Sequence, residues 1–367
     1  MITIYLHSGT GKTGSSAIQA FLNYNRGNLL ANCSCLYPDF YSKTIHKGSN
    51  CHNHCKSISK QAEKITIIND IEKAVDFCKK NGISTIVISC EGLFARPDIG
   101  ESILRNFHPD SGLSFRIVVF FRRQDHFLES GWKQWGLKDI RFASISEYVE
   151  SNNIRWLDYL NEYDSIFGKE NIIIHPYEKE QLPDGLICEF LTMIGIRYSA
   201  YTWREPPESN VNTNYGFNRD IIEILKLNRS LCKNIHDNTL LNFFYSTLPD
   251  TYQKKPYEHY DLLSPQERIK ILEKYDTINQ TIAREYLGRE DGKLFFEPWP
   301  DPDEPWEPYE GLTVEKIVPI FTTMLYNIDR RHNTRIAAIR KKKGGTSLRT
   351  FAARIKKRLW SFFEDRI

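Results

Sequence analysis

The stretch that most constrains the fold lies at positions 2–22. An apolar run, Ile2–Leu6, leads into three glycines, one lysine and several hydroxyl residues before a second apolar stretch begins. This order predicts a strand, a tight turn and a helix. Glycines let successive backbone N–H groups point inward, and a helix N-terminus adds partial positive charge and unpaired donors. The segment therefore predicts an anion-binding loop with Lys12 at its centre.

This loop is close to a Walker A motif but departs from it at one position. The motif reads G-x-x-x-x-G-K-[ST], and Leu6 stands where its first glycine belongs. A loop without this glycine would enclose fewer phosphates. It therefore suits one phosphate that carries a second group better than it suits a triphosphate. The residues expected to hold the anion are Gly11, Lys12, Thr13, Gly14, Ser15 and Ser16.

Further apolar runs predict more strands, with amphipathic helices between them. The strands are expected over Thr85–Ser89, Phe115–Phe121 and Asn171–His175, and helices over Asp70–Asn81 and Trp156–Phe167. Such alternation predicts an α/β fold in which helices flank a parallel β-sheet. Together with the Walker A-like loop, this order resembles P-loop nucleoside triphosphate hydrolases. The strand signal fades after about residue 200, so a mostly helical C-terminal part is expected. Ligands of these sheets bind at the carboxyl ends of the strands.

Three regions are expected along the chain: an α/β core over 1–200, a helical extension packed on the core over 201–334, and a basic tail over 335–367. Within the extension, the sequence Ser264-Pro265-Gln266-Glu267 is a capping box that predicts the start of a helix. A second helix is expected over Thr313–Arg330, despite its internal proline.

The tail is strongly basic. Residues 335–363 contain ten Lys and Arg and no acid, so the remainder carries 3 − 10 = −7. Apolar spacing over 347–363 predicts a basic amphipathic helix. Three interpretations stay open for it: a loosely packed solvated tail, peripheral contact with an anionic membrane surface, or docking on a partner or nonspecific nucleic acid.

Composition limits the class of protein. No run of 18 apolar residues is present, and the N-terminus enters a strand without a leader pattern, so a cytoplasmic protein is expected. Cys51 and Cys55 have C-x₃-C spacing, yet no second well-spaced pair follows. A polar loop is therefore favoured there over a zinc site, and no metal is expected to take part in function.

Two motifs together resemble bacterial sulfotransferases that use 3′-phosphoadenosine-5′-phosphosulfate (PAPS). The first is the loop His7–Ser16, and the second is Arg122 after a predicted strand, followed eight residues later by Ser130. The resemblance covers 1–200, and 210–300 more loosely. It implies that the loop binds the 5′ end of PAPS, whereas Arg122 and Ser130, at a helix start, bind the 3′-phosphate. Arg123 is an alternative to Arg122, because only one of two adjacent strand residues faces the ligand.

Sulfuryl transfer requires in-line attack, a cation near the leaving oxygen and a base for the acceptor hydroxyl. Lys12 is the expected cation, and the desulfated nucleotide PAP is the expected product. Glu91, directly after a predicted strand, is the first choice for the base, because the resemblance implies a base there. His7 is the rival, although a role in orienting the loop is also open for it.

The resemblance implies a carbohydrate acceptor, such as a surface polysaccharide or a glycolipid. Aromatic residues suit stacking on sugar rings but also suit a protein core; those in question are Trp132, Trp135, Tyr148 and Trp156. The main alternative function is a P-loop kinase or NTPase that uses ATP and Mg²⁺. No specific nucleic-acid partner is expected, since only the tail favours one.

Overall fold

The computed structural model describes residues 1–40, 61–107, 112–206, 216–254 and 262–342. The Cys51/Cys55 pair and the predicted helix over 347–363 lie outside the described residues. The chain divides into two compact units: unit 1 is Met1–Tyr215 with Lys255–Pro308, and unit 2 is Gly216–Lys254 with Tyr309–Ile367. This division differs from the expected boundary at residue 200, because residues from Lys255 to Pro308 belong with the sheet.

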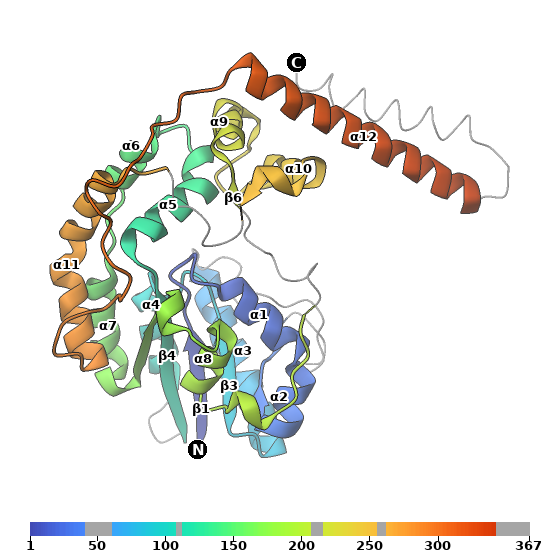
Figure 1. The fold of residues 1–367 in the computed structure, drawn as a ribbon. Coiled ribbons are helices and arrows are strands. Elements are labelled where there is room, and N and C mark those ends of the chain that lie inside the picture. The colour runs from blue at the N-terminus through green and yellow to red at the C-terminus, as the bar shows by residue number, and fades with distance from the viewer. Residues whose placement is uncertain (41–60, 108–111, 207–215, 255–261, 343–367) are drawn as a thin grey trace. The chain divides into compact units, whose positions relative to one another are not determined.

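Unit 1 is built on a five-stranded parallel sheet with the order β2-β3-β1-β4-β5, which confirms the predicted α/β fold (Figure 1). Its strands are β1 (Ile2–His7), β2 (Cys35–Leu36), β3 (Thr85–Ser89), β4 (Leu113–Phe121) and β5 (Ile172–Pro176). The two-residue strand β2 was not predicted. Unit 2 contains a short antiparallel pair, β6 (Gly216–Phe217) and β7 (Gln253–Lys254).

Helices make up most of the remaining described structure. In unit 1 they are α1 (Ser15–Tyr24), α2 (Arg26–Cys33), α3 (Gln61–Asn81), α4 (Pro97–Asn106), α5 (Gln124–Gln134), α6 (Ile145–Ser151), α7 (Trp156–Phe167), α8 (Leu186–Met193) and α11 (Pro265–Leu287). In unit 2 they are α9 (Arg219–Leu227), α10 (Thr239–Thr247) and α12 (Val314–Lys342). The predicted capping box opens α11, where the Glu267 backbone N–H donates to Ser264 Oγ at 3.2 Å.

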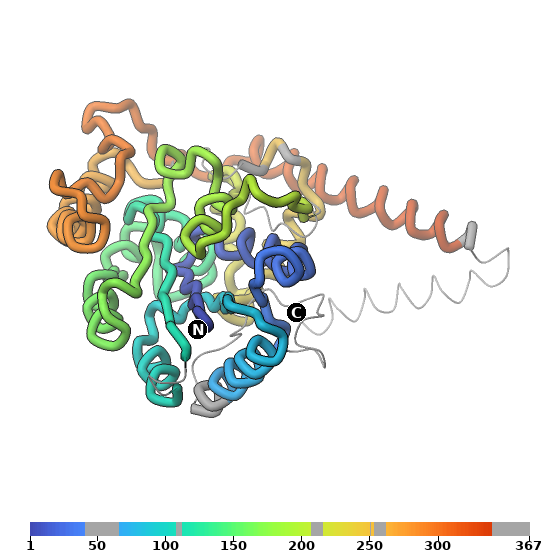
Figure 2. Tube along the Cα trace, turned by 90° about the horizontal axis from the view of Figure 1, so that it is seen from below, coloured from blue at the N-terminus to red at the C-terminus, as the bar shows by residue number. Residues whose placement is uncertain are grey.

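Apolar side chains cover both faces of the sheet, as its nearly continuous apolar strands require. On one face Tyr5, Val118 and Phe120 pack in one buried cluster with residues of α1, α2 and α8. On the other face Phe121 stacks on Trp156 at the start of α7, with ring centroids 4.7 Å apart. The sheet is therefore a buried central layer (Figure 2).

The strand order places a topological switch point between β1 and β4. Both neighbours of β1 are parallel to it, β3 on one side and β4 on the other. The chain leaves β1 toward β2 and leaves β4 toward β5, which lie on opposite sides of the sheet. Strands whose connections diverge in this way leave a crevice at their carboxyl ends, where ligands of open α/β sheets bind. None of the described helices is both long enough and apolar enough to cross a bilayer.

Candidate anion-binding site

Residues 8–14 form a tight loop from the end of β1 to the start of α1. Gly11, Lys12 and Gly14 have positive φ angles of 85°, 57° and 76°. Among the described residues, Lys12 is one of only two non-glycine residues with a positive φ. Such a conformation is unfavourable for a residue with a Cβ, and it persists where the surrounding structure enforces it. Lys12 is thus held in a backbone conformation that it would rarely adopt alone.

The loop is fixed from both neighbouring strands. Thr10 Oγ1 donates to the carbonyl oxygen of Phe120 in β4 at 2.9 Å, and the Gly92 N–H, after β3, donates to the Gly9 carbonyl at 3.3 Å. A side chain at Gly9 would clash with Ser15 Oγ and lie 3.4 Å from Glu91 Cγ. The loop, the N-terminus of α1 and Glu91 therefore pack closely together.

Three hydroxyl side chains around this loop are buried without a hydrogen-bond partner among the described residues. They belong to Ser8, Thr13 and Ser15, which are 0%, 0% and 2% exposed. Burying a hydroxyl without a partner costs about 1–3 kcal/mol on mutational scales, so native structures rarely tolerate it unless the site has another use. Three such groups at one loop indicate a site for a ligand rich in hydrogen-bond acceptors.

The N-terminus of α1 adds further donors. Gly14 is the N-cap residue in the left-handed conformation, and no described side chain caps this end of the helix. Ser15 and Ser16 are the first two residues of α1, as predicted. The unpaired N–H groups of a first helical turn and the helix dipole both favour an anion at this position.

Lys12 adds a full positive charge to the site. Its ammonium group donates to Gln134 Oε1 at the end of α5. Burial and the nearby Arg122 together lower the pKa of Lys12 to about 8, and Glu91 opposes the shift. A buried ammonium beside another cation gains most from the arrival of an anion, because the anion offsets both effects.

Two adjacent arginines after β4 have different surroundings, which favours Arg122 over Arg123 as the residue that faces the loop. Arg122 Nη1 donates to the Lys12 backbone carbonyl at 3.0 Å, and its guanidinium lies 5.8 Å from the centre of the Tyr177 ring. Arg123 instead pairs with Asp125 through two contacts of 2.9 Å and with Glu297 at 3.0 Å. Arg122 therefore belongs to the loop, and Arg123 belongs to a buried ion network.

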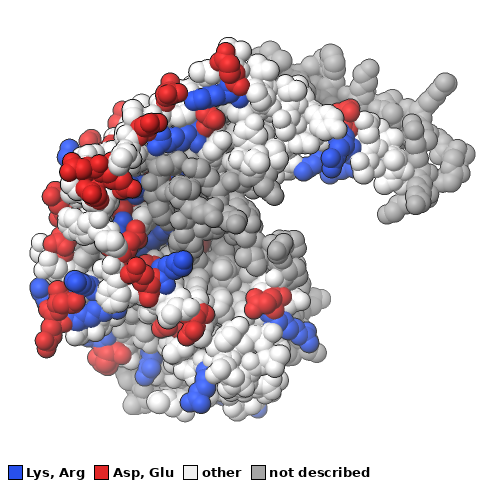
Figure 3. Space-filling model, in the orientation of Figure 1, with Lys and Arg blue, Asp and Glu red and all other residues white. Residues whose placement is uncertain are grey.

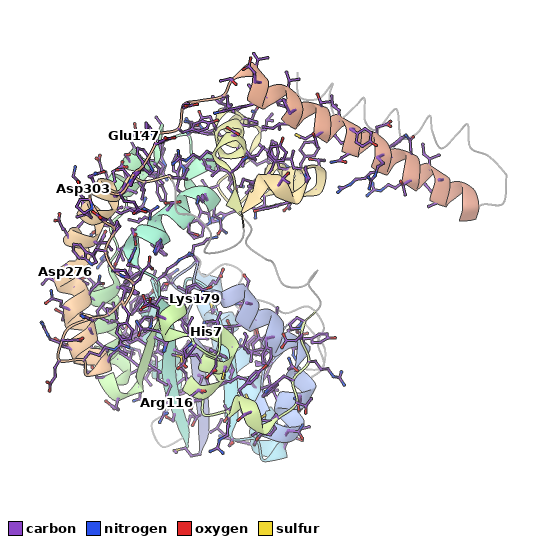
Figure 4. The ribbon with its side chains drawn as sticks, in the orientation of Figure 1. His7, Arg116, Glu147, Lys179, Asp276 and Asp303 are labelled. Atoms are coloured by element: carbon purple, nitrogen blue, oxygen red, sulfur yellow. The ribbon has the colours of Figure 1, made fainter. Side chains whose placement is uncertain are left out.

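The two candidate bases also differ in their surroundings. Glu91 is exposed, and desolvation by nearby protein raises the pKa of its carboxyl while Lys12 opposes that shift. His7 is fully buried in unit 1 (Figure 4), where its Nδ1 lies 2.8 Å from Ser89 Oγ. Burial lowers the pKa of His7 to about 3, so the ring is neutral. The geometry of His7 favours a role in orienting the loop, and Glu91 is the more exposed of the two residues.

The expected position of Ser130 at a helix start is wrong. Helix α5 begins at Gln124, so Ser130 is its seventh residue and lies beyond the first-turn N–H groups invoked for the 3′-phosphate. The acidic residue Asp125 in the first turn was the sequence signal for the earlier start. Ser130 therefore has only its side chain to offer a ligand.

Two residues near the loop, Gln134 and Tyr177, were not predicted as part of the site. Gln134 accepts from Lys12, and a Cβ added to Gly14 would lie 3.3 Å from the Tyr177 hydroxyl oxygen. Tyr177 directly follows β5, so its place beside a strand end was a usable signal. Of the four aromatics considered for sugar stacking, Trp132, Tyr148 and Trp156 are buried. Trp135 is partly exposed, and its ring lies 3.3 Å from a Cβ built on Gly11.

Comparison with known proteins assigns no activity. No protein-family model matches the chain. A protein of Archaeoglobus fulgidus, described as uncharacterized, is 27% identical over 179 residues, which are 47% of this chain and 46% of that protein. The chain thus spans about half the length of this relative. Any functional conclusion must therefore rest on the geometry of the site.

Proposed function

We propose that the protein transfers a sulfuryl group from PAPS to a hydroxyl group of a carbohydrate acceptor. The observation that carries the proposal is that two cationic residues, Lys12 in the loop after β1 and Arg122 directly after β4, lie next to each other. The Arg122 guanidinium reaches the Lys12 carbonyl, and buried hydroxyls without described partners surround the loop. A donor with anionic groups at two separate points, such as PAPS, suits two cations held in fixed positions.

In this proposal the residues share the work of an in-line displacement. Lys12 and the first turn of α1 stabilise the charge that develops on the leaving phosphate oxygen. The acceptor oxygen forms a bond to sulfur while the bond between sulfur and that phosphate oxygen breaks. The acceptor proton passes to Glu91, and PAP leaves with the bonding electron pair. The raised pKa of Glu91 brings its basicity closer to neutral pH, as general-base catalysis favours.

The carbohydrate acceptor is supported by the surroundings of the loop. Trp135 is a partly exposed indole next to Gly11, and such a ring can stack on the apolar face of a sugar. Glu91 lies on the side of the loop that faces β3, since Gly92 binds the carbonyl of Gly9. An acceptor reaching both groups would cover the loop and exclude water from the transferred group.

A kinase or NTPase is the second candidate function, and one observation favours it. Thr13 occupies the Walker A position whose hydroxyl binds Mg²⁺ in P-loop proteins, and this hydroxyl is buried without a described partner. The absent first glycine, at Leu6, weighs against a triphosphate.

Ligand-induced shifts in melting temperature separate the two functions, because a ligand that binds only the folded state stabilises it. We expect PAP to raise the melting temperature by several degrees at millimolar concentration, and ATP with Mg²⁺ to raise it less. A larger shift with ATP and Mg²⁺ than with PAP would contradict the sulfotransferase proposal. Lys12→Ala should abolish the shift, whereas the exposed Lys179→Ala (Figure 4) should keep it.

Glu91→Gln tests the base. This isosteric change keeps the hydrogen-bonding shape but removes the proton acceptor, so we expect PAP binding within about twofold of wild type and turnover reduced about 10²- to 10⁴-fold. The exposed Glu150→Gln in α6 is the matched control and should leave both unchanged. Full turnover in Glu91→Gln would remove Glu91 as the base.

A further inference from the structure

Helix α12 of unit 2 presents a row of exposed apolar side chains. The row consists of Val314, Val318, Phe321, Leu325 and Ile328, which are between 40% and 69% exposed. A neighbouring row on the same helix is buried: Ile320 and Met324 are 1% and 4% exposed. The buried row lies on the side of α12 that contacts α10, where Asn327 Nδ2 donates to the Thr247 carbonyl at 2.8 Å. The exposed row lies beside this packed side.

The spacing of the exposed row makes it one continuous surface. Its members follow one another at intervals of four, three, four and three residues, which places them on a single helix face. Ile336 and Ile339 continue the row with partial exposure. The exposed apolar row extends over Val314–Ile328, about half of this helix of 29 residues, and exceeds the scattered exposed residues normal for a protein surface.

Charge on this helix is also distributed unevenly. The 314–342 sequence contains seven basic residues and two acidic ones, Glu315 and Asp329, which gives 7 − 2 = +5. Six of the seven basic residues lie from Arg330 onward. Figure 3 shows largely uncharged side chains along the first part of α12 and Lys or Arg further along. Apolar surface and positive charge thus occur together on one helix.

We propose that α12 is a membrane-binding helix that lies flat on an anionic lipid surface. The exposed row would enter the interface between headgroups and acyl chains, and the basic residues would bind anionic headgroups. A second copy of α12 is disfavoured as the occupant, because pairing two helices of net charge +5 brings like charges together. This inference goes beyond the proposed function and does not depend on it.

Vesicle co-sedimentation of the full chain tests the proposal. We expect binding to phosphatidylcholine vesicles that contain phosphatidylglycerol, weaker binding to phosphatidylcholine alone, and release by added salt. The double variant Leu325→Ser with Ile328→Ser should bind at least about tenfold more weakly. Tyr326→Ser is the matched control, since Tyr326 is equally exposed, at 66% against 67% for Leu325, but points about 100° around the helix from it.

A second double variant removes two positive charges at exposed positions, where substitution should not affect folding. Arg330→Gln with Arg331→Gln should weaken binding to the anionic vesicles by about fivefold for each charge removed. Three results would each overturn the proposal: equal binding to both kinds of vesicle, no binding by the wild type, or unchanged binding by the serine variant. A wild-type dimer in analytical ultracentrifugation that becomes monomeric in the serine variant, without vesicle binding, would instead assign the surface to a second copy.

Discussion

Arg122 and Arg123 are neighbours in sequence but belong to two regions of unit 1 with opposite character. On the Arg123 side, charges are matched: Arg123 pairs with Asp125, Arg268 of α11 pairs with Asp125 and Glu129, and Lys133 pairs with Glu129. On the Arg122 side, the loop gathers Lys12 and Arg122 beside buried hydroxyls that have no partner among the described residues.

The difference separates a structural region from a binding region. Burial opposes ionisation of Asp125, yet His126, Arg123 and Arg268 hold its pKa well below the usual range. At the loop, in contrast, burial and Arg122 lower the pKa of Lys12 to about 8. The first region pairs its charges within the protein, whereas in the second burial disfavours the charge on Lys12, an effect that a bound anion would offset. Experiments that act on one region and not the other test this interpretation.

The largest expected effect is on turnover in Lys12→Ala. In the proposed reaction Lys12 is the cation beside the leaving oxygen, so its removal should lower kcat for sulfuryl transfer by about 10³-fold. The melting temperature of the free protein should change little or rise, because a charge that burial disfavours is lost. Turnover is measured with labelled PAPS, and unfolding by calorimetry. Lys179→Ala serves as the control. A Lys12→Ala protein with near-normal turnover would assign the loop a structural role only.

A smaller effect is expected on stability in Arg123→Gln. This change leaves Asp125 buried with fewer partners, so the free energy of unfolding should fall by about 3 kcal/mol, or about 6–12 °C in melting temperature. PAP affinity of the folded protein should stay within about twofold of wild type. Urea unfolding and PAP titration measure the two quantities. Loss of affinity with unchanged stability would exchange the roles of the two arginines.

Arg122→Gln should lower PAP affinity and leave the free energy of unfolding nearly unchanged, which is the reverse of the expectation for Arg123→Gln. The expected free-energy change is also smaller. We expect PAP affinity to fall about 30-fold, about 2 kcal/mol, because a charge-assisted hydrogen bond to phosphate is lost. The free energy of unfolding should change by less than about 1 kcal/mol, since the side chain is partly exposed. If Arg122→Gln and Arg123→Gln lower stability alike, the contrast between the two regions fails.

Local sequence was enough to predict the loop and its strand. The backbone there depends on nearby residues: Gly11 and Gly14 supply positive φ angles, and Ser15 opens the helix. Local sequence could not predict which of Arg122 and Arg123 faces the loop. It depends on Asp125 and Glu297, and the contact with Glu297 joins positions far apart in the sequence.

Long-range contacts also explain why the division into two compact units could not be predicted from local sequence. The salt bridge from Arg268 to Asp125 spans 143 positions, and no local pattern around Arg268 indicates that α11 packs with α5. The capping box predicted where α11 begins because both of its partners lie within three residues. Sequence therefore located the helix but not its neighbours. Gln134 escaped prediction for the same reason, since it contacts Lys12 across 122 positions.

The smallest expected effect is a pH dependence of PAP binding that belongs to the loop alone. Because burial lowers the pKa of Lys12 to about 8, its ammonium is charged below that pH and neutral above it. PAP affinity should therefore fall as pH rises from 7 to 9, by at most about tenfold for each unit above the pKa.

Lys12→Arg is the matched control for this titration, because a guanidinium stays charged throughout the range. If the variant binds PAP at all, its affinity should be flat between pH 7 and 9. Calorimetry of the wild type at pH 8.5, in buffers of different ionisation enthalpy, should show proton uptake on binding, since a bound anion raises the pKa of Lys12. An affinity for the wild type that is as flat as that of Lys12→Arg would show that Lys12 does not contact the anion. The loop would then have only a structural role, like the ion network around Arg123.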